Sequence, residues 1–173
     1  MWQMRVCGVV LALASTLAGS GCTTVVAGSA APGPRVVGLD PDVVADECLL
    51  TTAEAGELVD LAVEPPQQSS VDRGDGSRGA ACVVTSDAEP VALVNVYAVR
   101  SGTPGDYVRA TGAAARRELP GVGAGATVIG TAAGPALQLA GGRYLVTILV
   151  SGSVPTDEEW HAAAEAALTR LPA

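Results

Sequence analysis

Residues 91–99 of the chain read Val-Ala-Leu-Val-Asn-Val-Tyr-Ala-Val, which is the strongest strand signal in the sequence. The alternation of side chains with a period of two predicts a β-strand. Its two faces are both largely apolar, with Leu93, Asn95 and Tyr97 on one and Ala92, Val94 and Val96 on the other. Because a strand that is apolar on both faces is usually covered on both, we expect residues 91–99 to lie at the centre of a sheet.

Further strands are expected on either side of this central one. A turn signal at residues 87–90 separates it from a strand over residues 82–85. Three more strands are predicted at residues 127–130, 136–140 and 143–151. Gly141 and Gly142 are expected to form a two-residue hairpin turn between the last two, because such turns need positive φ angles. Residues 67–79 and 120–126 are predicted to be loops, since the first is polar and both are rich in glycine.

Three helices interrupt the strands. The capping box formed by Thr51 and Glu54 opens a helix over residues 52–62, which Pro65 and Pro66 end. Thr103 and Pro104 open a second helix that is expected to reach Leu119. A third begins with the capping box at residues 156–159, and its apolar stripe is Trp160, Ala164, Ala167, Leu168 and Leu171.

We expect the last helix to lie across the sheet with Trp160 packed on strand residues such as Tyr144, Val146 or Ile148. Strands joined by hairpins and interrupted by helices are typical of the α+β class. The sequence therefore predicts an antiparallel sheet of about five strands packed with three helices, after a signal peptide and a flexible tether.

Residues 1–21 resemble a targeting segment rather than part of the fold. Their apolar stretch at residues 6–17 is shorter than the roughly 18 residues that a membrane span requires. It is followed by the small residues 18–21 and then Cys22, the pattern that a lipoprotein signal peptidase needs. We predict a lipoprotein signal peptide at 1–21, a lipid on Cys22, a tether at 22–39 and one domain at 40–173. An ordinary cleaved secretory signal and a membrane helix are the alternatives.

The cysteine count also indicates export. Cys7 lies in the signal peptide and Cys22 is assigned to lipid, which leaves Cys48 and Cys82. An even remainder in an exported chain favours a disulfide between them, the alternatives being a metal pair or two free thiols. Neither cysteine belongs to a C-x-x-C motif, and the single histidine is far away in sequence, so we expect no metal.

The charge balance narrows the class of partner. Ten arginines face eighteen acidic residues, which gives a net charge of −8, and the chain has only two Trp, three Tyr and no Phe. Nucleic-acid binding requires basic stripes and stacking rings, so this composition argues against it. The basic cluster of Arg109, Arg116 and Arg117 is interpreted as a solvated helix face, with contact to anionic head groups or an acidic partner as the alternative.

Two further patterns resemble a nucleotide-binding motif and a set of catalytic residues, but both favour structural roles. Residues 121–126 match G-x-G-x-x-A, yet a strand is predicted after them, whereas the dinucleotide fingerprint needs a helix there. His161 is the lone histidine, and the acidic residues 157–159 suit a helix N-terminus. We therefore predict no catalytic residues and no cofactor.

Three motifs in order resemble a known family. Residues 46–51, Asp-Glu-Cys-Leu-Leu-Thr, with Glu54, are similar to the D-x-C-x-L-L-T-x-x-E opening of actinobacterial, mycobacterial-type secreted lipoproteins of unknown function. Cys82 resembles their second cysteine, although Val84 stands where they usually have Trp, and residues 120–126 resemble their P-G-x-G-x-x-A loop. The resemblance implies a lipid-anchored extracytoplasmic α+β domain with a disulfide, and it implies no catalytic residues.

These observations predict a non-enzymatic, lipid-anchored protein on the outer face of the cell membrane, whose domain binds an envelope protein, a lipid or a wall component. One alternative is a carrier that holds an apolar ligand in an internal pocket, which would require an apolar cavity of several hundred Å³, the order of size of ligand pockets. A second is an envelope hydrolase, which would require an acid, a base and a nucleophile in one cleft.

Overall fold

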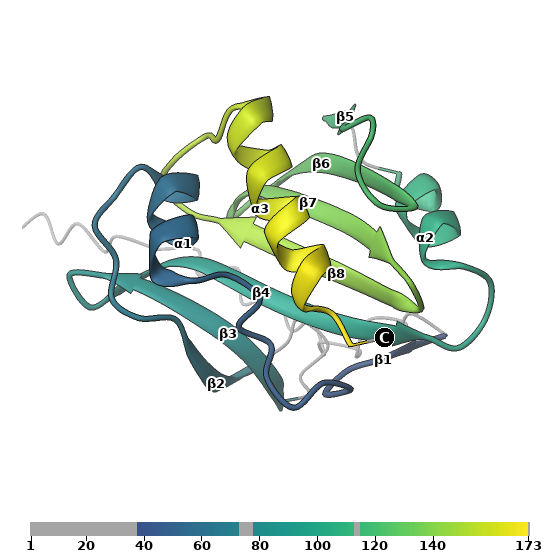
Figure 1. Ribbon diagram of the computed structural model, residues 1–173, viewed down its shortest axis with the longest axis horizontal. Coiled ribbons are helices and arrows are strands. Elements are labelled where there is room, and N and C mark those ends of the chain that lie inside the picture. Colours follow the sequence, from purple (N-terminus) through teal and green to yellow (C-terminus); the bar gives the residue numbers. More distant parts are fainter. Residues whose placement is uncertain (1–37, 73–77, 113–114, 173) are drawn as a thin grey trace, which may run out of the picture. The chain divides into compact units, whose positions relative to one another are not determined.

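The computed structural model describes residues 38–72, 78–112 and 115–172, which form an α+β fold of three helices and an eight-stranded antiparallel sheet (Figure 1). Cys22, the residue predicted to carry a lipid, and the predicted signal peptide lie outside these residues. The strands are β1 (Leu39–Asp40), β2 (Gln67–Asp72), β3 (Arg78–Ser86), β4 (Glu89–Val99), β5 (Arg116–Glu118), β6 (Gly125–Thr131), β7 (Gly134–Gly141) and β8 (Tyr144–Val150). The helices are α1 (Thr52–Val59), α2 (Pro104–Ala110) and α3 (Asp157–Arg170).

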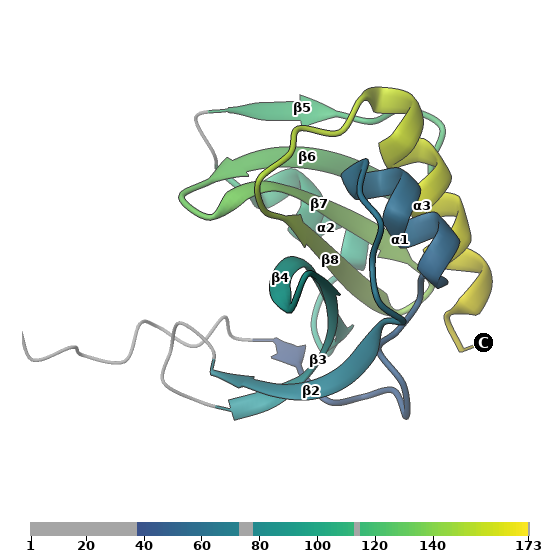
Figure 2. The same ribbon diagram turned by 90° about the vertical axis from the view of Figure 1, so that its left-hand side faces the viewer.

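The sheet has the strand order β2-β3-β4-β8-β7-β6-β5, which Figure 2 shows from bottom to top. β4 contains the apolar stretch at residues 91–99, and its place inside the sheet confirms the prediction of a central strand. β8 pairs along one side of β4, with Val96 opposite Val146. Along its other side β4 pairs first with β3 and then, at Val99, with Leu39 of β1, the last residue of the predicted tether.

The main core lies between one face of the sheet and the helices α1 and α3, which lie side by side in both views (Figures 1 and 2). Seven even-numbered residues of β4 and β8 point into this core and are almost completely buried. They are Ala92, Val94, Val96, Tyr144, Val146, Ile148 and Val150.

The other sheet face is covered at one end by α2. Val108 of this helix packs with Ala140 of β7 and Leu145 of β8, with Tyr97 of β4 at the edge of the cluster. Leu93, Asn95 and Tyr97 of β4 are half-buried on this face. Both faces of the central strand are thus at least partly covered, as its sequence predicts.

The capping box and the apolar stripe predicted for the last helix are both confirmed. The capping box of Thr156 and Glu159 is present, and Trp160, Ala164 and Ala167 are buried in the main core. The remaining members of the predicted stripe, Leu168 and Leu171, are half-buried against the same core. None of the three helices in the described ranges is long and apolar enough to cross a membrane.

Several boundaries differ from the prediction. α1 has its predicted capping box but ends at Val59 rather than at residue 62, because Asp60 takes a left-handed conformation with φ of 54°. The turn between β7 and β8 is shifted by one residue, since Gly141 pairs with Tyr144 and only Gly142 has a positive φ. The sheet has eight strands rather than about five, and β1, β2 and β5 are the additions.

Residues 67–79 were expected to be a loop, and this is wrong for its larger part. Gln67–Asp72 forms β2, which pairs along its whole length with β3, from Gln67 opposite Val83 to Asp72 opposite Arg78. β2 is an edge strand whose side chains are nearly all exposed, so its residues show no apolar alternation. Its pairing depends on backbone hydrogen bonds to β3, which sequence periodicity does not report.

The second helix was expected to reach Leu119, and this is also wrong. α2 ends at Ala110, and the hydroxyl of Thr111 donates to the carbonyl oxygen of Tyr107 and to the side-chain oxygen of Gln138 on β7. The arginines that follow pair with β6 as β5, from Arg116 opposite Ile129 onward. Tertiary pairing here overrides the helix propensity of an alanine- and arginine-rich segment.

The buried indole provides the first prediction. Trp160 is fully buried, so Trp160→Ala should lower the free energy of unfolding by about 3–5 kcal/mol. His161 is half-exposed on the same helix, and His161→Ala should change stability by less than about 0.5 kcal/mol. Urea unfolding at equilibrium measures both. A loss for Trp160→Ala no larger than that for His161→Ala would show that the ring does not support the core.

Candidate functional site

The three arginines predicted to share a helix face lie on two different elements, so that prediction is wrong. Arg109 is on α2, whereas Arg116 and Arg117 are on β5. Neighbouring residues of a strand point to opposite faces of the sheet. Arg117 forms an ion pair with Asp157 at the start of α3, and Arg116 reaches toward α2 instead. The cluster is therefore divided between the two faces of the sheet.

Arg116 is held in place by the end of α2. Its guanidinium Nη1 donates to the carbonyl oxygen of Arg109 at 2.6 Å and to that of Thr111 at 3.3 Å. A cation at this position satisfies carbonyl groups that have no partner within the helix. Its second nitrogen, Nη2, lies 3.5 Å from the carboxylate of Glu118, whose side chain is largely exposed.

Arg109 and Arg116 line one open cleft of about 300 Å³. Its walls come from Gly105 and Val108 of α2, from β5, and from the glycine-rich loop at residues 119–126. The structure thus brings together two of the three predicted contact residues, on different elements, beside a loop that the sequence analysis had considered separately. We call this feature the arginine–glycine cleft.

The orientation of Arg109 is set by Asp106 on the same helix. The carboxylate of Asp106 accepts from Arg109 Nη2 at 2.6 Å, and from the hydroxyl and amide of Thr103 at 2.7 and 2.9 Å. These bonds, with the Thr103 hydroxyl contributing most, lower the pKa of Asp106 from 3.8 to about 2. The helix cap and the position of Arg109 therefore depend on the same ionised group.

The glycine-rich loop is fixed at both ends and shaped by glycine. Val122 is buried in the main core, and the amide of Ala124 donates to the carbonyl oxygen of Ala140 at 2.9 Å. Gly123 has a φ of 52°, and a Cβ there would lie 2.5 Å from that same carbonyl oxygen. Only glycine fits this position. The strand β6 follows the loop, as predicted, in place of the helix that a dinucleotide fingerprint needs.

A second cleft, of about 470 Å³, lies between α1 and α3 and is lined mainly by carboxylates. Glu54 and Glu159 are the acidic members of the two capping boxes, and Glu54 also pairs with Arg170 at 3.0 Å. The other carboxylates on its wall are Glu57, Asp60 and Glu158. Within the described ranges, no group of three or more His, Cys, Asp or Glu side chains is arranged to hold a metal ion. The capping interpretation of Glu159 is confirmed.

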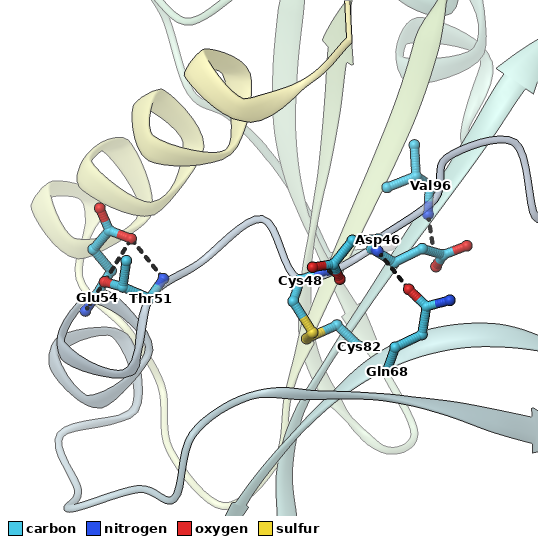
Figure 3. The surroundings of a disulfide bond; sticks show 8 residues. Asp46, Cys48, Thr51, Glu54, Gln68, Cys82 and Val96 are labelled. Atoms are coloured by element: carbon cyan, nitrogen blue, oxygen red, sulfur yellow. Dashed lines mark hydrogen bonds between the residues drawn. A yellow bond between two sulfur atoms is a disulfide. The ribbon is translucent and has the colours of Figure 1, made fainter.

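The predicted disulfide is confirmed. Cys48 and Cys82 are bonded, with their Cα atoms 4.9 Å apart, and the bond joins the segment before α1 to β3 (Figure 3). Asp46 holds the backbone next to the disulfide, since its carboxylate accepts from the amide of Cys48 at 2.8 Å. Disulfides of this kind are typical of proteins exported to an oxidising compartment.

Glu47, next to the disulfide, is a buried charged residue that sequence reasoning missed. One of its carboxylate oxygens accepts from the amide of Val96 at 3.3 Å, and its own amide donates to the side-chain oxygen of Gln68 at 3.0 Å (Figure 3). The only signal was its position beside Cys48, and a single glutamate between Asp46 and Cys48 gives no indication of burial.

The comparisons with known proteins assign neither a family nor a function to the chain. No protein-family model matches the chain, and no match is found among curated proteins or among solved structures.

The low pKa of Asp106 predicts a pH response of α2. The carboxylate is ionised in the folded state down to about pH 2, so its contribution to the helix cap is complete above pH 3.8. That contribution should be lost as the pH falls through about 2. NMR titration of the Asp106 carboxyl carbon, with amide exchange across α2, measures the midpoint. A midpoint near 3.8 would contradict the bonds to Thr103 and Arg109.

Glu47 provides a matched pair of variants. Glu47→Ala removes the acceptor of the Val96 amide and should lower the free energy of unfolding by about 1–3 kcal/mol. Glu47→Gln keeps an acceptor oxygen and should cost less. Urea unfolding measures both under oxidising conditions, so that the disulfide is intact in each. Equal losses in the two variants would show that the hydrogen bond to Val96 is not what Glu47 contributes.

Proposed function

We propose that the chain is an exported lipoprotein, anchored by a lipid on Cys22 to the outer face of the cell membrane, whose domain is a non-enzymatic binding module. The single observation that carries the binding role is the arginine–glycine cleft. It places Arg109 and Arg116 at the wall of one open cleft, in a chain whose net charge is −8. A cationic site on an acidic protein is suited to a small anionic ligand.

The proposal of export and anchoring draws on two independent features. The first is the leader, in which a short apolar stretch and the small residues 18–21 precede Cys22. The second is the Cys48–Cys82 disulfide, because such bonds persist in oxidising compartments and are rare in the cytosol. The resemblance to actinobacterial lipoproteins supports the same proposal on the motifs at residues 46–51 and 120–126.

The packing of the domain favours a surface site over an internal one. A carrier would hold its ligand between the sheet and the helices, but Trp160, Tyr144 and Leu137 fill that space and are almost completely buried. A hydrolase would bring a nucleophile and a base to one cleft. His161 of α3 is not among the residues that line either cleft. A binding module with a surface site therefore fits these observations better than a carrier or a hydrolase does.

Labelling with a radioactive fatty acid tests the anchor in cells that express the full chain. The wild-type protein should incorporate label, and Cys22→Ser should abolish it, because the thiol carries the lipid. Cys7→Ser is the matched control, since Cys7 belongs to the predicted signal peptide and its loss should leave labelling unchanged. Undiminished labelling of Cys22→Ser would exclude a lipid on that residue.

A further inference from the structure

We infer that the arginine–glycine cleft binds a phosphate group, which Arg109, Arg116 and the backbone amides of the loop at residues 121–123 would hold together. The inference rests on the proposed binding function and names its ligand class. Three features of the cleft carry it: two oriented guanidinium groups, a row of amides with no acceptor, and a carboxylate that is only loosely attached to one of the arginines.

The two guanidinium groups differ in how firmly they are held. The side chain of Arg116 is only 21% exposed, and the carbonyl oxygens of Arg109 and Thr111 at the end of α2 hold Nη1, so its guanidinium is fixed in one orientation at the cleft. The side chain of Arg109 is 63% exposed and is held through Asp106 alone. Guanidinium groups match the geometry of phosphate oxygens through paired N–H donors. Arg116 provides a fixed cation, and Arg109 one that can adjust to the ligand.

The loop adds neutral donors on the same wall. Gly121 and Gly123 have φ angles of 82° and 52°, whereas Val122 between them does not have a positive φ. Successive amides in turns of this kind form concavities that bind anions. Among the described residues, no hydrogen bond uses the amides of Gly121, Val122 or Gly123 as donors, although Ala124 and Leu119 on either side donate to backbone carbonyls. The loop that lines the cleft thus has three adjacent amides without an acceptor among the described residues.

Glu118 occupies the position that the ligand would take beside Arg116. Its carboxylate lies 3.5 Å from Nη2, longer than a good charge-assisted hydrogen bond, and its side chain is 79% exposed. An exposed pair of this length is weak, so an incoming anion can replace it at little cost. Glu118 therefore competes with the ligand instead of contributing to its binding.

The number and arrangement of donors favour phosphate over a carboxylate. A phosphate ester presents two or three charged or polar oxygens in a tetrahedral arrangement, whereas a carboxylate presents two oxygens in one plane. Arg109 of α2, Arg116 of β5 and the glycine-rich loop all line the cleft, so it offers more donors than a planar carboxylate can use. A cleft of about 300 Å³ accommodates the phosphate and a small attached group. The phosphate could belong to a soluble ester or to a lipid headgroup, and the experiment separates these sources.

The test is an NMR titration of the full chain in an uncharged sugar detergent at low ionic strength. The probes are inorganic phosphate, glycerol 3-phosphate, and short-chain phosphatidylglycerol kept below its micelle concentration. We expect saturable shifts of the amide signals of residues 121–123 with at least one probe. Tighter binding of phosphatidylglycerol than of glycerol 3-phosphate would identify a lipid headgroup as the source, and the reverse would identify a soluble ester.

Three variants distinguish a built site from general charge attraction. Arg109→Gln should weaken binding about tenfold or more, because it removes a charged donor. Arg78→Gln is the matched control, since Arg78 also has an exposed side chain paired with an aspartate but lies on β3. It should leave binding unchanged. Glu118→Gln should tighten binding severalfold, because it removes the carboxylate beside Arg116.

Two results would overturn the inference. One is the absence of saturable shifts at residues 121–123 with all three probes while the rest of the spectrum shows a folded chain. The other is an equal loss of affinity in Arg78→Gln and Arg109→Gln, which would indicate attraction to charge in general. A chain that incorporates fatty acid on Cys22 but fails this titration refutes the phosphate ligand alone. A chain that binds phosphate but carries no lipid refutes the anchor alone.

Discussion

The central strand β4 changes its partner partway along one side. The fold depends on the segment that contacts β4 between these two partner strands. β3 pairs with β4 as far as Val94, and β1 takes over at Ala98. Between them the amide of Val96 is satisfied by the buried carboxylate of Glu47, and the next residue, Cys48, is bonded to β3. A buried amide without an acceptor is costly, so the fold requires this short segment to lie beside Val96. It also sets where α1 begins, four residues after Cys48, and hence where α1 meets α3.

The features that the sequence predicted well are those that neighbouring residues determine. Each capping box is a relation between residues three apart, so the starts of α1 and α3 follow from Thr51 and Thr156. The centre of the sheet follows from the apolar alternation of residues 91–99, and the burial of Trp160 follows from helical spacing. In each case the local pattern and the tertiary packing favour the same structure.

The features that the sequence did not predict depend on distant partners. β2 is polar and exposed, and only the backbone of β3 makes it a strand. β5 is three residues long, and its pairing with β6 separates Arg116 from Arg117. Sequence reasoning therefore identified Arg109, Arg116 and the glycine-rich loop individually, but it could not show that they line one cleft. Glu47 escaped notice because its burial results from the gap between β1 and β3, which no local pattern reveals.

The register of β5 connects the proposed site to the core. With Arg116 opposite Ile129 and Arg117 opposite Val128, the first arginine supports α2 and the cleft, and the second pairs with Asp157 at the start of α3. A shift of one residue would exchange the two faces, so that neither arginine could meet its present partners. The ion pair on the α3 side therefore favours the register that places Arg116 in the cleft. The short edge strand thus contacts both features: Arg117 pairs with α3, which Trp160 packs into the core, and Arg116 lines the cleft.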